Sequence, residues 1–155
     1  MNVANWEIKK LESSVPIPYD LLDLADPSRA MIDSYLNEGT CYIGILNKEI
    51  IGVYVIKEIS SGILEIMNIA VKENFQGKGY GKKLIDHVID LAREKGFKQL
   101  HIGTGNSSID QLAFYQKCGF EIHAIEKNFF LDNYIEPIFE NGIQCKHLVK
   151  LCLKF

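Results

Sequence analysis

The first part of the chain changes its apolar period once, from that of a strand to that of a helix, which predicts one strand followed by two short helices. Residues 6–12 alternate weakly with the two-residue period of a strand. Residues 19–24 and 28–36 instead carry apolar side chains at helical spacing. Asp26-Pro27 separates the two helical stretches, because proline disfavours helix in the residue that precedes it.

The middle of the chain predicts three strands in succession. Residues 41–46 and 50–57 are rich in Ile, Val and Tyr. The polar residues Asn47-Lys48-Glu49 lie between them, which is typical of a β-hairpin. Ser60-Ser61-Gly62 then turns the chain into a further strand, Ile63 to Val71.

The second half alternates helices with strands. A glycine-rich turn at residues 76–81 precedes a run of apolar positions at helical spacing from Leu84 to Ala92, with a polar stripe opposite. We expect this amphipathic helix to lie on a sheet and to end at Lys95-Gly96. The remaining patterns predict a strand at residues 99–103, a helix from Ser108, as its cap, to Lys117, and strands at residues 120–125 and 144–153.

This order of elements predicts a single α+β domain over residues 1–155, built as a mixed sheet with helices on its faces. A length of 155 residues suits one domain, since a domain usually takes roughly 100 to 200 residues. Hydrophobic residues make up 47% of the chain and charged residues 24%, so the chain can bury a core.

Charge and composition exclude several functional classes. The net charge of -3 argues against a protein that coats nucleic acid or an anionic membrane. No apolar run approaches the roughly 20 residues that span a bilayer, and the first ten residues lack a secretory core. We therefore expect a cytoplasmic protein. The cysteines lack metal-ligand spacing, so we expect no metal site and no disulfide framework: Cys41, Cys118, Cys145 and Cys152.

The glycine-rich turn carries the strongest chemical signal. A strand that leads through glycines into a helix presents unpaired N–H groups, with the positive end of the helix dipole behind them, and this arrangement binds phosphate. Residues 72–83 hold four lysines against Glu73, a net charge of +3 in a chain that is negative overall. A multiply phosphorylated small ligand fits this asymmetry, and a purely structural tight turn is the alternative.

The sequence around the glycine-rich turn resembles a motif of a known family. Gly77-x-Gly79-x-Gly81 matches neither of the two common nucleotide motifs. Residues 69–85, IAVKENFQGKGYGKKLI, instead resemble the acetyl-CoA binding motif of the GNAT N-acetyltransferase superfamily, with Gln76, Gly79 and Gly81 in its key positions. Residues 112–120, LAFYQKCGF, are similar to the late helix of that family.

This resemblance implies a central mixed, mostly antiparallel sheet of six to seven strands, with splayed middle strands and about four helices on its faces. It also implies acetyl-CoA as co-substrate. In such proteins the pantetheine arm lies in the gap between the splayed strands, and the N–H at the position of Ile69 contacts the thioester carbonyl. The coenzyme contacts implied along the motif are Ile69, Val71, Gln76, Gly77, Lys78, Gly79, Tyr80, Gly81 and Lys82.

The resemblance assigns two side chains to catalysis. Tyr115 matches the tyrosine that acts as general acid toward the coenzyme A thiolate, and a phenol pKa of ~10 is close enough to the ~8.5 of a thiol for that role. Glu65 lies four residues before Ile69, where some members carry a glutamate base. Strand alternation predicts that Glu65, Met67 and Ile69 share one face unless a bulge intervenes. A solvated acid at the strand end is the alternative for Glu65.

Asn106 and Ser108 depart from the family pattern. The family often has an asparagine seven residues before the tyrosine, touching the pantetheine arm, but Ser108 occupies that position and Asn106 lies two residues earlier. Both are candidates for coenzyme contact, and helix capping is the other interpretation of Ser108.

Residues 121–140 carry five acids against Lys127, a net charge of -4. Four aromatic residues are interleaved with them: Phe129, Phe130, Tyr134 and Phe139. An aromatic and acidic wall suits a cationic amine, and a loop that covers a sheet edge is the alternative.

We therefore expect direct transfer of an acetyl group from acetyl-CoA to a primary amine in a ternary complex, without an acyl-enzyme. The alternative is a non-catalytic acyl-CoA-binding sensor or interaction module. The acceptor, the acyl-chain preference and the formation of a homodimer stay open.

Overall fold

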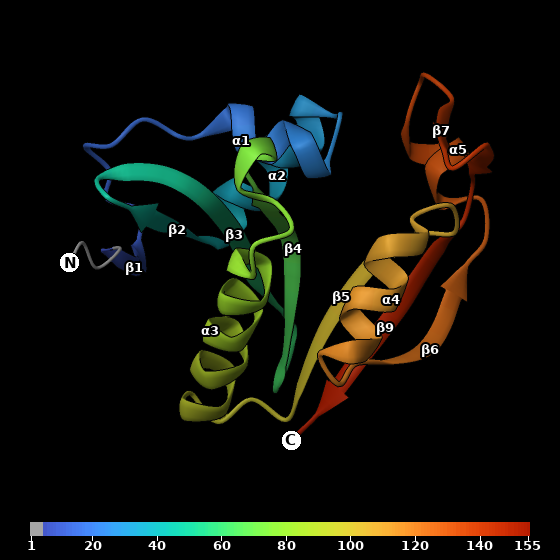
Figure 1. Ribbon diagram of the computed structural model, residues 1–155. Coiled ribbons are helices and arrows are strands. Elements are labelled where there is room, and N and C mark those ends of the chain that lie inside the picture. The colour runs from blue at the N-terminus through green and yellow to red at the C-terminus, as the bar shows by residue number, and fades with distance from the viewer. Residues whose placement is uncertain (1–4) are drawn as a thin grey trace.

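One seven-stranded sheet forms the centre of the protein, with strand order β1-β2-β3-β4-β5-β9-β6 (Figure 1). The computed structural model describes residues 5–155. A separate two-stranded sheet is formed by β7 and β8. The strands are β1 (Trp6–Lys10), β2 (Thr40–Leu46), β3 (Glu49–Ser60), β4 (Ile63–Val71), β5 (Gln99–Gly105), β6 (Glu121–Glu126), β7 (Ile138–Glu140), β8 (Ile143–Cys145) and β9 (Leu148–Lys154).

Helices cover both faces of the large sheet. Leu22 and Ile32 pack in one apolar cluster, whereas Leu84 and Tyr115 pack in a second cluster on the opposite face. The first cluster therefore places α1 and α2 on one face, and the second places α3 and α4 on the other. The helices are α1 (Tyr19–Ala25), α2 (Arg29–Glu38), the short 3-10 helix η1 (Glu73–Phe75), α3 (Tyr80–Glu94), α4 (Ile109–Lys117) and α5 (Phe129–Asn133).

The sheet splits in its middle. All neighbouring strands are antiparallel except β4 and β5, which run parallel and pair only at residues 63–66 and 99–102. Beyond Ile66 and Ile102 the two strands diverge, so that β4 and β5 form the two arms of a V (Figure 1). The backbone of residues 67–71 therefore has β3 on one side and no strand on the other.

A β-bulge lies on β4 where the split begins. The pairing of β4 with β3 skips Met67, which is therefore an extra residue on β4. The bulge resets the alternation of side chains: Ile66 packs toward α3, Asn68 reaches the Leu22 carbonyl of α1, and Ile69 packs toward α3 again.

The structure confirms the α+β architecture and most of the predicted boundaries. The hairpin between β2 and β3 turns at Asn47 and Lys48, with φ of 49° and 71°. Asp26-Pro27 separates α1 from α2, and the Ser28 hydroxyl caps α2 by accepting the Met31 N–H at 3.2 Å.

Three predicted segments differ from the structure. The strand expected at residues 99–103 continues to Gly105. The strand expected at residues 144–153 is interrupted at Lys146-His147, because the Asn106 side chain accepts both of their N–H groups. The long connection after β6 contains α5 and β7, whose short patterns gave no periodic signal.

Candidate active site

The turn between β4 and α3 has the backbone of an anion-binding site. Gly77 and Gly79 have φ of 74° and 91°, which only glycine adopts without strain. Gly79 is the N-cap of α3, and no side chain bonds to the first N–H groups of this helix. These N–H groups lie at the positive end of a 15-residue helix, so they suit a phosphate.

Packing on either side fixes the position of the turn. The Gln76 side chain donates a hydrogen bond of 2.8 Å to the carbonyl of Val71 at the end of β4. The Tyr80 ring lies between those of Trp6 and Phe75, with centroid distances of 5.0 and 6.2 Å. The turn is therefore attached both to the strand before it and to β1 at the edge of the sheet.

Two of the four lysines around the turn form ion pairs with carboxylates. Lys72 forms an ion pair of 2.5 Å with Glu49, and Lys82 bonds both oxygens of Asp86 at 3.0 and 3.1 Å. The bond to Asp86 raises the pKa of Lys82. Within residues 5–155, Lys78 and Lys83 take part in no ion pair. The expected net charge of +3 is thus partly compensated, and of these two lysines Lys78 lies on the turn itself and Lys83 in the first turn of α3.

Tyr115 lies next to the split in the sheet. It is 5% exposed and packs in the cluster to which Ile69 and Val71 also contribute. Burial raises the pKa of the Tyr115 phenol, with a smaller contribution from Cys118. In the described part of the chain its hydroxyl makes no hydrogen bond, so the proton is free for a group placed in the split.

The second half of α4 also lies beside the first turn of α3. A methyl group added at Gly81 would lie 3.6 Å from the ring of Phe114, the residue before Tyr115. The glycine turn and the tyrosine, 34 positions apart in the sequence, are therefore neighbours in space.

The predicted face of Glu65 is wrong, because the bulge at Met67 interrupts the alternation. Leu64 and Ile66 pack toward α3, so Glu65 between them points to the opposite face, away from the Ile69 side chain. Burial raises the pKa of the Glu65 carboxyl, opposed by Lys150 and Lys57. Glu65 is thus a half-buried acid on the α1 and α2 face, whereas Tyr115 lies on the other face.

Asn106 and Ser108 use their side chains within the protein. The Asn106 carboxamide bonds the Gln144 carbonyl at 3.1 Å and the N–H groups of Lys146 and His147 at 2.7 and 2.8 Å. Ser108 occupies the N-cap position of α4, but its hydroxyl makes no capping bond and donates instead to Glu140 at 2.8 Å. The capping prediction for Ser108 is therefore wrong, and both residues hold the β7-β8 hairpin against the end of β5.

The segment after β6 is ordered around an aromatic cluster. Phe129, Phe130 and Tyr134 pack with ring centroids 5.1 to 6.4 Å apart. Asp132 and Glu136 are exposed on the same segment. The sequence suggested residues 121–140 as an acceptor wall, and we call the segment that follows β6, residues 127–142, the acceptor loop.

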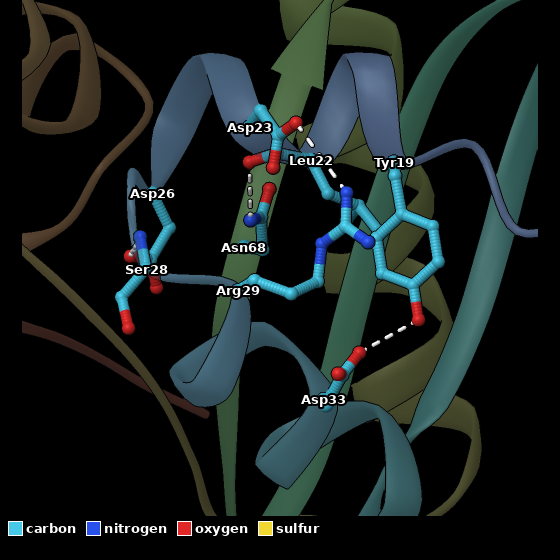
Figure 2. Close-up of polar contacts among 8 residues, drawn as sticks. All are labelled: Tyr19, Leu22, Asp23, Asp26, Ser28, Arg29, Asp33 and Asn68. Carbon is cyan, nitrogen blue, oxygen red and sulfur yellow. Dashed lines mark hydrogen bonds and ion pairs between the residues drawn. The ribbon is translucent and has the colours of Figure 1, made fainter.

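The contacts of a buried carboxylate near this loop, Asp26, were not predicted from the sequence. Asp26 is 8% exposed and accepts hydrogen bonds from Tyr35 at 3.1 Å, Tyr134 at 2.8 Å and the Ser28 N–H at 3.0 Å (the last drawn in Figure 2). Asp26 looked like an ordinary residue before a proline, and no local pattern links it to Tyr134.

Residues 5–155 lack two further kinds of feature. No group of three His, Cys, Asp or Glu side chains in this range is placed to hold a metal ion. Over the same range, no helix combines the length and the apolar composition needed to cross a membrane.

Known proteins resemble this chain over nearly its whole length. A family model described as the acetyltransferase (GNAT) family matches residues 4–120. The uncharacterized N-acetyltransferase YvbK of Bacillus subtilis strain 168 is 50% identical over 153 residues, which cover 99% of each chain.

Solved structures agree with this sequence match. A GNAT family acetyltransferase from Elizabethkingia anophelis with acetyl-CoA bound has a TM-score of 0.96 and 51% identity, covering 97% of this chain and 99% of that one. A Bacillus subtilis acetyltransferase in complex with CoA has a TM-score of 0.92 and 49% identity, covering 97% and 99%. These likenesses confirm the predicted fold and the acyltransferase class, and the bound coenzymes agree with the expected acetyl-CoA. The chain belongs to the GNAT family of acetyltransferases.

Proposed function

We propose that the protein transfers an acetyl group from acetyl-CoA directly to a primary amine while both substrates are bound. The observation that carries this proposal is the split between β4 and β5, which opens beyond Ile66 and Ile102 and ends at the glycine turn. A thioester arm laid in the split has its phosphates at the turn and its reactive end beside Ile69 and Tyr115.

The split suits a pantetheine arm because it leaves backbone groups without partners. Pairing with β3 uses one edge of residues 67–71, and the other edge faces the gap. Buried backbone N–H and C=O groups need partners, and the amides of the arm supply them as an added strand would. The pyrophosphate then bonds the N–H groups from Gly77 to Lys82, and Lys78 adds its charge. The coenzymes bound in the two similar structures support this assignment.

The chemistry at the thioester uses groups from both faces of the sheet. The N–H of Ile69 stabilises the charge that develops on the carbonyl oxygen. Tyr115 delivers its proton to the departing sulfur, because burial keeps the phenol protonated and desolvation also makes a buried thiolate more basic.

Glu65 removes the proton of the attacking amine, directly or through a water. Its burial raises the pKa of the carboxyl, and a base becomes more effective as its pKa approaches the working pH. Glu65 and Tyr115 lie on opposite faces of the sheet, so the amine approaches from the α1 and α2 face while the thiolate departs toward α4.

The acceptor is a cationic amine that binds against the acceptor loop. Asp132 and Glu136 are exposed there and attract a cation before it reaches the site. The half-buried rings of Phe129 and Phe130 supply an apolar surface beside these acids.

A panel of primary amines tests this function. Thiol release from acetyl-CoA is followed with each amine and without amine, and initial rates are measured over a grid of both substrate concentrations. Intersecting lines and amine-dependent release are expected for a ternary complex. Parallel lines, which are typical of an acyl-enzyme, or release at equal rates without amine would contradict the proposal. The same grid with propionyl-CoA measures the acyl-chain preference.

A further inference from the structure

A chain of hydrogen bonds connects the acceptor loop with the strand that borders the split. Tyr134 donates to one oxygen of Asp26 at 2.8 Å, and Tyr35 donates to the other oxygen at 3.1 Å. Tyr35 in turn accepts a hydrogen bond of 2.9 Å from the Asn68 side chain. Asn68 is the residue before Ile69, so the chain ends beside the N–H assigned to the thioester.

The direction of the Asn68 side chain is fixed by its partners. Asn68 Nδ2 also donates to the Leu22 carbonyl at 3.0 Å, as drawn in Figure 2, and a carbonyl can only accept. The opposite atom, Oδ1, is buried and has no partner in the described part of the chain. A buried carbonyl oxygen without a partner is unfavourable. What an asparagine supplies at this position is therefore its two donated bonds, to α1 and to Tyr35.

The bond between Tyr134 and Asp26 also connects two distant segments of the fold. It joins residues 108 positions apart and, within residues 5–155, is the single hydrogen bond between the acceptor loop and the α1 and α2 segment. The acceptor loop includes β7, which pairs with β8, and these two strands are attached to the end of β5 through Ser108 and Asn106. Asp26 and Asn68 belong to the β4 side of the split. The bond therefore links the two arms of the V on the side from which the amine approaches.

We propose that Tyr134, Asp26, Tyr35 and Asn68 form a positioning chain that couples the closure of the acceptor loop to the orientation of the Ile69 N–H. Tyr35 is both donor and acceptor, so a change at Asp26 alters its bond to Asn68, since hydrogen bonds in a chain polarise one another. Asn68 holds β4 directly after the bulge, where no second strand supports it. None of these four side chains needs to touch the reacting atoms. This inference rests on the proposed function, because the role of Ile69 is part of it.

Tyr134→Phe and Tyr35→Phe test the chain. Each removes one donor to Asp26 and leaves the ring in place. We expect the kcat for a simple probe amine such as tyramine to fall roughly 3- to 30-fold, with the KM for acetyl-CoA unchanged. The direct readout is the ¹⁵N-labelled amide of Ile69: its chemical shift differs between the acetyl-CoA and CoA complexes where it contacts the thioester, and both variants should reduce this difference.

Tyr19→Phe is the matched control. Tyr19 on α1 also bonds an aspartate of α2, Asp33, at 2.6 Å (Figure 2), but this bond is exposed, and within residues 5–155 neither side chain is hydrogen-bonded to β4. We expect wild-type kcat and a wild-type Ile69 signal from this variant. Thermal melting of each protein reports folding, and Tyr134→Phe decides the outcome if the buried Tyr35→Phe protein does not fold.

The outcomes separate the two proposals. A wild-type Ile69 amide that does not distinguish acetyl-CoA from CoA would remove the thioester contact, and with it this part of the proposed function. A wild-type difference that persists in full in Tyr134→Phe would overturn the positioning chain alone. An equal loss of kcat and of the Ile69 shift difference in Tyr19→Phe would also overturn it. Removal of any hydrogen bond between α1 and α2 would then have the same effect.

Discussion

Ile66 and Ile102 form the last pair between β4 and β5, and both strands continue past this pair without each other. Beyond this pair β4 remains hydrogen-bonded to β3, and β5 remains hydrogen-bonded to β9. Each arm of the split is therefore paired on its outer side. The inner edges present unpaired backbone groups, which within a protein are usually covered. The geometry that ends the pairing thus also creates the surface that a coenzyme arm needs.

Replacing Gly79 by alanine should weaken both folding and coenzyme binding. A Cβ at Gly79 would meet nothing within 4 Å, so the penalty comes from the φ of 91° and not from a clash. We expect a loss of about 1 kcal/mol in the free energy of unfolding, measured with urea, and a higher Kd for CoA by calorimetry.

Gly142→Ala provides the control for this change. Gly142 has a φ of 73° and equally open surroundings, but it lies in the turn between β7 and β8. It should lose similar stability with an unchanged Kd for CoA. Equal weakening of CoA binding in both variants would mean that general destabilisation, and not the shape of the turn, determines affinity.

Reversing the charge of Lys78 should weaken CoA binding more than reversing the charge of Lys82. Lys78 takes part in no ion pair in the described residues, whereas Asp86 already compensates Lys82. We expect Lys78→Glu to raise the Kd for CoA by roughly tenfold at low salt and to flatten its dependence on ionic strength. Lys9→Glu, on exposed β1, changes the net charge equally and should leave both quantities unchanged. A larger effect from Lys82→Glu would place the phosphates farther along α3.

Tyr115→Phe should slow transfer without weakening coenzyme binding. The ring stays packed in the same cluster and only the acidic proton is lost, so we expect kcat to fall roughly 100-fold. Because burial raises the pKa of Tyr115, the wild-type rate should show no loss from ionisation of this phenol up to about pH 10. Tyr42→Phe is the control: Tyr42 packs against the same cluster but lies on β2, so this variant should keep the wild-type rate. Retention of full activity in Tyr115→Phe would remove the acid role.

Glu65→Gln should lower activity and, at neutral pH, favour folding. Burial raises the pKa of this carboxyl in the folded protein, so the native state prefers the protonated form. The free energy of unfolding of the wild type therefore falls as the pH rises from the ordinary glutamate pKa through the raised native value. The glutamine side chain does not titrate and avoids this loss. The free energy of unfolding of Glu65→Gln minus that of the wild type should therefore be more positive at pH 7 than at pH 3.5.

The activity of the same variant tests the base. We expect kcat/KM for the amine to fall roughly 100-fold at pH 7 and the acidic limb of its pH profile to lose the Glu65 titration. Glu7→Gln, on exposed β1, should change neither stability nor rate. A pH profile of unchanged shape in Glu65→Gln would assign the base to another group.

Neutralising the acceptor loop should act on the amine and not on the coenzyme. Asp132→Asn with Glu136→Gln should raise the KM for a cationic amine more than it lowers kcat, since both acids are exposed and act before the chemical step. Asp90→Asn with Glu94→Gln removes the same charges from the exposed side of α3 and should leave the amine KM unchanged. Equal effects of the two pairs would show that only overall charge matters.

Local sequence patterns predicted the parts of the site that are themselves local. The glycine turn and the following helix were placed correctly from their own spacing, whereas Tyr115 was singled out by the resemblance to the GNAT family and lies in the late helix predicted there. The face of Glu65 was not placed correctly, because a bulge depends on how β4 pairs with β3, and one extra residue at Met67 leaves no mark on composition.

Contacts between distant segments were beyond the reach of the sequence. Asp26 and Tyr134 meet only once α1 and the acceptor loop are both in place, and each looks ordinary in its own surroundings. Asn106 and Ser108 drew attention through a motif, but their partners, Lys146, His147 and Glu140, lie more than thirty residues away and decide what they do.

The place of β9 in the sheet has a consequence for how the protein reaches this structure. Residues 148–154 fill the slot between β5 and β6, so both of those strands lack a neighbour until the latest-made strand of the domain arrives. Before β9 is in place, the part of the sheet beneath Tyr115 is incomplete, whereas β1 to β4 can already pair with one another. A chain that ends before Leu148 should therefore lack acetyltransferase activity, although every proposed catalytic side chain would still be present. The unpaired edges of β5 and β6 would be exposed and prone to association.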